Sequence, residues 1–87
     1  MITYEDCLAL AGLTEEEVAA VARHERLPEM LAAELGGHLC SEPGGTARLT
    51  RMIRDDIEAA RRAGNCAEAA RLRLVLRHFC ATHPASG

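Results

Sequence analysis

Apolar residues in the second half of the chain recur every three or four positions, the spacing of one face of an α-helix. Gly64 ends the first such segment, residues 46–63, and Asn65 caps a second one that runs to about residue 83. Because only two residues join the segments, the pattern predicts an antiparallel helical hairpin over residues 46–83. The apolar stripe of the first segment consists of Leu49, Met52, Ile53, Ile57 and Ala60.

Two capping motifs predict two short helices near the start of the chain. In residues 3–6 (TYED) and 14–17 (TEEE), an acid lies three positions after a threonine, which is the capping-box pattern. Gly12 separates the two helices, and the second should continue to about Glu25. We expect the three acids of TEEE to interact with the positive end of their helix rather than with a metal ion.

A third helix is predicted to begin at Pro28, because proline suits the first turn of a helix and leucines recur at every fourth position around and after it. The pair Gly36-Gly37 either ends this helix or allows another helix to approach closely. The sequence EPGG at 42–45 divides an N-terminal helical half, 1–41, from the hairpin. The leucines are Leu27, Leu31, Leu35 and Leu39.

Composition supports an all-helical chain. Of 87 residues, 48% are apolar, alanine and leucine dominate them, and Tyr4 and Phe79 are the only aromatic residues. Alanine and leucine favour helices, whereas strands favour aromatic and β-branched side chains. We therefore predict a single all-α domain, a compact bundle of about five helices ending in an antiparallel hairpin, with a disordered tail at 84–87.

Charge is divided unevenly between the two halves. Residues 1–45 carry nine acids and two arginines, whereas residues 46–87 carry four acids and eight arginines. We expect the halves to attract each other, and the alternative is an arginine-lined face for an acidic partner. The net charge of −3 and the lack of aromatic stacking residues argue against nucleic-acid binding.

Several classes of function are excluded or disfavoured. The chain has no lysine, which removes P-loop and Schiff-base chemistry, and neither serine lies in a G-x-S-x-G motif. No catalytic residue and no cofactor are predicted. The N-terminus lacks the basic region of a signal peptide, and no apolar run is long enough to span a membrane. We expect a cytoplasmic protein that does not bind membranes, with its four cysteines reduced.

The segment RHFCATHP, residues 77–84, raises the question of a metal site. Cys80 and His83 lie at i and i+3 and can share a helix face, and His38 or Cys40 would complete a set of ligands. The alternative is an ordinary helix end, with histidines near the negative end of the helix and Cys80 as a small buried apolar residue. We favour the helix end and keep the metal site as a hypothesis.

Two acidic positions are expected to form ion pairs. Asp56 lies within the apolar stripe of residues 46–63, and a buried carboxylate needs a partner, for which Arg73 of the neighbouring helix is the candidate unless Asp56 lies at the edge of the stripe. The alternative is a general base with a raised pKa, for which the sequence offers no second catalytic group. Glu34 and His38, at i and i+4, are expected to form an exposed pair.

Leu74 faces away from the apolar face of the last predicted helix. A helix that is apolar on two sides is either central in a bundle or covered by a second subunit. We therefore predict a non-enzymatic protein-interaction module, a homodimer or a binder of another protein, that uses Leu74, Arg73 and Arg77. The alternative is a small metal-binding or thiol-sensing protein. The apolar face comprises Ala69, Leu72, Val75, Leu76, Phe79, Cys80 and His83.

Two segments, LTEEEVAAVARHERLPEM (13–30) and LVLRHFCATHP (74–84), resemble a family of small helical bacterial proteins of unassigned function. The resemblance extends over most of the chain. It implies an all-helical fold and assigns no residue a role.

Overall fold

The computed structural model describes residues 3–83, and these form five α-helices without any strand. The predicted all-α bundle is confirmed, whereas the predicted disordered tail at 84–87 lies outside the described residues. None of these helices is long and apolar enough to cross a membrane. The helices are α1 (Tyr4–Ala11), α2 (Glu15–Glu25), α3 (Glu29–Ser41), α4 (Gly45–Arg62) and α5 (Cys66–Thr82).

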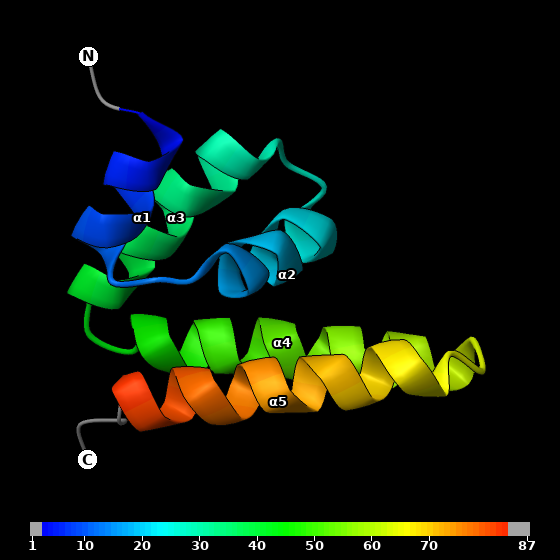
Figure 1. The fold of residues 1–87 in the computed structure, drawn as a ribbon. Helices are drawn as coiled ribbons and strands as arrows, with labels where there is room; N and C mark the ends of the chain where they lie inside the picture. Colours follow the sequence, from blue (N-terminus) through cyan, green and yellow to red (C-terminus); the bar gives the residue numbers. More distant parts are fainter. Residues whose placement is uncertain (1–2, 84–87) are drawn as a thin grey trace.

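The helices form two layers (Figure 1). The long helices α4 and α5 lie side by side as an antiparallel hairpin, as the short connection between them predicts. Helices α1 and α3 lie beside each other in the second layer, and α2 lies along the hairpin, in contact with α3, α4 and α5. The molecule measures 40 × 32 × 17 Å.

The predicted caps begin three of the helices. Thr3 and Thr14 each accept a hydrogen bond from a backbone N–H in the first turn, and the acid three residues later completes a capping box at both helices. The side chain of Asn65 caps α5 in the same way. Each cap satisfies backbone groups that the first turn of a helix leaves without a partner.

The buried face of α3 differs from the predicted leucine stripe. Leu39 is buried and Leu35 packs against the core, but Leu31 is 49% exposed, and the other buried positions of α3 are Ala32, Ala33 and Gly36. The helix continues through Gly36-Gly37, and the bare surface of Gly36 lets Leu13 approach closely. A Cβ added to Gly36 would lie 2.6 Å from Leu13 Cδ1. Small residues therefore form the contact face.

The corner between α3 and α4 depends on two glycines. Gly44 has φ +77°, a left-handed conformation that L side chains rarely adopt. Gly45 is buried, and a Cβ at this position would overlap the backbone of Leu39. Residues 42–44, between α3 and α4, form a tight corner that places the start of α4 against the end of α3.

Candidate functional site

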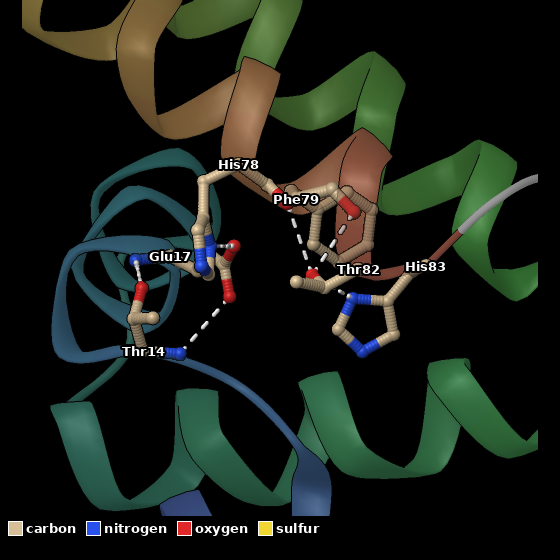
Figure 2. A network of polar contacts seen from close by, with 6 residues as sticks. All are labelled: Thr14, Glu17, His78, Phe79, Thr82 and His83. Carbon is tan, nitrogen blue, oxygen red and sulfur yellow. Dashed lines mark hydrogen bonds and ion pairs between the residues drawn. The ribbon is translucent and has the colours of Figure 1, made fainter.

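A buried glutamate joins the two layers. Glu17, at the start of α2, is only 2% exposed. Its Oε1 accepts a hydrogen bond from the backbone N–H of Thr14 at 2.9 Å, and its Oε2 lies 3.0 Å from Nδ1 of His78 on α5 (Figure 2). The sequence predicts the capping bond, but it does not distinguish Glu17 from the neighbouring acids, which are exposed.

The end of α5 is stabilised by its own side chains. The ring of His83 stacks on Phe79, with ring centroids 4.6 Å apart and an interplanar angle of 19°. The hydroxyl of Thr82 lies 3.0 Å from the carbonyl oxygen of His78 and 3.0 Å from His83 Nδ1 (Figure 2). These contacts support the interpretation of RHFCATHP as a helix end. The prediction that Cys80 is buried is wrong, because its side chain is exposed.

The four candidate metal ligands do not gather in one place. Cys80 and His83 line one hollow, whereas His38 lines a different one with Cys7. Cys40 is half-buried, and burial together with the charge of a nearby glutamate raises the pKa of its thiol. Within residues 3–83, no group of three or more histidine, cysteine or acidic side chains could hold a metal ion. Metal binding through this set stays a prediction.

The predicted ion pair between Glu34 and His38 is wrong. His38 Nε2 instead lies 2.6 Å from Oε1 of Glu42, four residues further along the chain. Both side chains of this pair are largely exposed to solvent, so the pair contributes little to stability.

Asp56 is buried, as predicted, but not beside Arg73. The residue is 7% exposed, and its Oδ2 atom is buried without a hydrogen-bond partner among the described residues. Burial raises the pKa of Asp56 from 3.8 to about 6, against the opposing effect of His24 and Arg23 on α2. Arg73 is exposed because the preceding residue, Leu72, occupies the inward position on α5. Successive residues point about 100° apart around the helix axis, so Leu72 and Arg73 cannot both face α4.

Ion pairs link the two halves, which the sequence predicts to attract each other, but the sequence did not identify the residues that form them. Arg23 Nη1 lies 2.7 Å from Glu68 Oε1, and His24 Nε2 lies 3.0 Å from Asp55 Oδ2, so both bases belong to the acidic half. Hydrogen bonds from Arg71 and Arg23 lower the pKa of Glu68 to about 2. Among the described residues, no arginine of α4 or α5 forms an ion pair with an acid of the N-terminal half, and His78, which pairs with Glu17, is the base that the hairpin contributes.

Five arginines of the hairpin form no ion pair with any residue in the described range. All five are exposed, and three of them follow one another at intervals of three residues along α4. Helix residues at this spacing lie on neighbouring turns of one side. The five arginines are Arg48, Arg51, Arg54, Arg73 and Arg77.

Two hollows on the hairpin carry candidate binding residues. The outer hollow has a volume of about 450 Å³ and lies between the start of α4 and the end of α5. It is lined by Thr46, Ala47, Thr50, Arg51, Arg54, Cys80 and His83.

The Leu74 hollow has a volume of about 300 Å³. It is lined by Thr14, Glu16, Arg71, Leu74, Val75 and His78.

Comparisons with known protein families, with curated proteins and with solved structures give no match to this chain. The functional argument therefore depends on the surfaces of the protein itself.

Proposed function

We propose that this protein is a non-enzymatic, cytoplasmic protein-interaction module that forms a homodimer through the surface around Leu74. Leu74 is 65% exposed, although full burial of a leucine side chain stabilises a folded or bound state by about 1.5–3 kcal/mol. Its exposure removes the alternative that α5 is central in its own bundle. The side chain stands beside the Leu74 hollow, which Val75 also lines. This exposed leucine next to an unfilled hollow is the observation that carries the proposal.

A second copy of the chain is the partner that the charges favour. The Leu74 hollow has an acid, Glu16, and a base, Arg71, on one small surface. In a two-fold dimer this surface meets itself, so each acid can face the base of the other copy. Arg77 lies one turn after Leu74 on α5 and adds a base without an ion pair of its own in the described range.

The expected affinity is modest. Stable interfaces bury about 800 Å² on each partner, which is more than one leucine and its hollow supply. Two leucines enter each two-fold dimer, and together they contribute about 3–6 kcal/mol, which by itself corresponds to dissociation constants from about 6 mM down to about 40 μM. With the charged contacts added, we expect a weak dimer that dissociates at tens to hundreds of micromolar.

Sedimentation velocity over about three decades of protein concentration tests the proposal. Leu74→Ser should raise the dimer dissociation constant at least ~100-fold, because each dimer loses two buried leucines. The matched control is Leu10→Ser on α1, which removes a leucine that is 79% exposed, and its dissociation constant should equal that of the unaltered protein. Far-UV circular dichroism checks that both variants keep their helices.

Two results would refute the homodimer. One is an unaltered protein that sediments as a monomer at every concentration up to several hundred micromolar. The other is an equal effect of Leu10→Ser and Leu74→Ser, because the contact would then not depend on the α5 surface.

A metal-binding or thiol-sensing function is the second candidate, and one observation favours it. Cys80 and His83 line the same hollow, and the Cys80 thiol is exposed. Elemental analysis of untagged protein tests this function. Stoichiometric metal that is lost on Cys80→Ser would support it, whereas metal-free protein with a thermal stability unchanged by a chelator would refute metal binding.

A further inference from the structure

The outer hollow is a basic surface without acids. Two arginines, Arg51 and Arg54, line it from α4, and Cys80 and His83 line it from the end of α5. No carboxylate is among its described lining residues. Its volume of about 450 Å³ is in the range of small-molecule sites.

Both arginines remain available to a ligand. Asp55, on the same helix, is bonded to His24, and Glu58 is bonded to Arg61 and Arg62. Neither Arg51 nor Arg54 has an ion-pair partner in residues 3–83. A guanidinium group donates paired hydrogen bonds in a geometry that matches the oxygens of an oxyanion. Two such groups on neighbouring turns of α4 can hold the same anion.

Further hydrogen-bond donors lie at the same place. Helix α4 begins without a side-chain cap and without an acid in its first turn. The second and third backbone N–H groups of a helix have no partner within the helix, and in α4 they belong to Thr46 and Ala47, which line the outer hollow. The hydroxyls of Thr46 and Thr50 are on the same surface.

We propose that the outer hollow binds the phosphate group of a small phosphate monoester. The hollow offers six donor groups, namely two guanidinium groups, two hydroxyls and two backbone N–H groups. A carboxylate accepts only about four hydrogen bonds, whereas the three terminal oxygens of a phosphate monoester can accept bonds from all six groups. The organic part of the ester would lie against Ala47 and Cys80. This site does not depend on the proposed dimer, because the outer hollow and the Leu74 hollow share no lining residue.

Titration followed by amide chemical shifts in nuclear magnetic resonance tests the proposal. The probes are inorganic phosphate, phenyl phosphate and acetate, added at about 0.15 M salt, where charges more than ~8 Å apart are largely screened. Both phosphate compounds should bind with millimolar or lower dissociation constants. The largest shifts should occur at Thr46, Ala47 and their neighbours in α4. Tighter binding of phenyl phosphate than of inorganic phosphate would show that the organic group contacts the hollow.

Paired variants localise the binding. Arg51→Gln with Arg54→Gln should weaken phosphate binding at least ~10-fold, because hydrogen bonds to charged groups are lost. The matched control, Arg61→Gln with Arg62→Gln, removes the same charge from exposed arginines that line neither the outer hollow nor the Leu74 hollow, and it should change the dissociation constant less than ~2-fold.

Three results would overturn the proposal. The first is an absence of phosphate-dependent shifts in α4 of the unaltered protein, which requires no variant. The second is equal phosphate affinity in the two double variants. The third is acetate binding as tight as phosphate binding, which would make the surface a general anion site rather than one for phosphate monoesters.

Discussion

Replacing the buried Asp56 by asparagine should make the protein more stable at neutral pH. The carboxylate of Asp56 has lost nearly all contact with water, and its Oδ2 has no hydrogen-bond partner in the described range. His24 and Arg23 compensate only part of this cost, because the pKa of Asp56 is still raised from 3.8 to about 6. Asparagine has nearly the same shape and carries no charge, so it imitates the protonated form.

The magnitude follows from the two pKa values. One pKa unit corresponds to about 1.4 kcal/mol, so the rise from 3.8 to about 6 corresponds to ~3 kcal/mol. The folded protein holds the Asp56 proton up to about pH 6, whereas the unfolded chain releases it near pH 3.8. Stability therefore falls as the pH rises through this window and levels off above it. The value is an upper bound, because the asparagine amide adds two N–H groups that need partners.

Urea unfolding, followed by circular dichroism between about pH 4 and pH 8, measures the effect. Asp56→Asn and the unaltered protein should have nearly the same free energy of unfolding near pH 4. At pH 7 the variant should be more stable by up to ~3 kcal/mol. The control is Asp55→Asn, which removes the charge of an exposed aspartate that lies 3.0 Å from His24 Nε2. It should lower stability by less than about 1 kcal/mol.

The reasoning fails if the stability difference between Asp56→Asn and the unaltered protein is the same at both ends of this pH range. It also fails if Asp56→Asn lowers stability at neutral pH. That result would mean that the attraction between the Asp56 carboxylate and the bases of α2 exceeds the cost of burying it.

Two further substitutions test contacts between helices, with stability again read from urea unfolding. Glu17→Ala should lower the free energy of unfolding by about 2 kcal/mol, because it removes a cap of α2 and a buried bond to α5, whereas Glu16→Ala should change it by less than about 0.5 kcal/mol. Equal effects would show that the buried bond is unimportant. Gly45→Ala should cost about 3 kcal/mol or more, because its Cβ would overlap the backbone of Leu39. Gly44→Ala has open space around its Cβ but a left-handed backbone, and should cost only about 1–2 kcal/mol; a larger cost at Gly44 than at Gly45 would contradict this account.

The candidate sites were only partly predictable. Leu74 was recognised from its position opposite the apolar face of α5, and the structure confirms that its side chain is exposed. Arg51 and Arg54 were not singled out, and the only signal was the basic composition of the second half of the chain. The outer hollow exists because the hairpin brings the start of α4 beside the end of α5, about thirty residues further along the chain. A local pattern does not contain this pairing.

The number of helices, their order and nearly all their ends were determined by the sequence itself. Capping bonds such as those of Thr14 and Asn65 join groups within four residues of each other, so a short stretch of sequence is enough to specify them. The left-handed end of α2 at Arg26 had no comparable signal.

Only the tertiary structure decided which side of each helix is buried and which charges lose water. In α3 the small residues Ala32, Ala33 and Gly36 were buried beside Leu39, whereas Leu31 of the predicted stripe stayed exposed, and Gly36 admits a close approach of Leu13. Asp56 faces α2 instead of the predicted arginine on α5. These outcomes depend on the fit between surfaces that are far apart in the chain, and the free energy of close packing is set only when those surfaces meet.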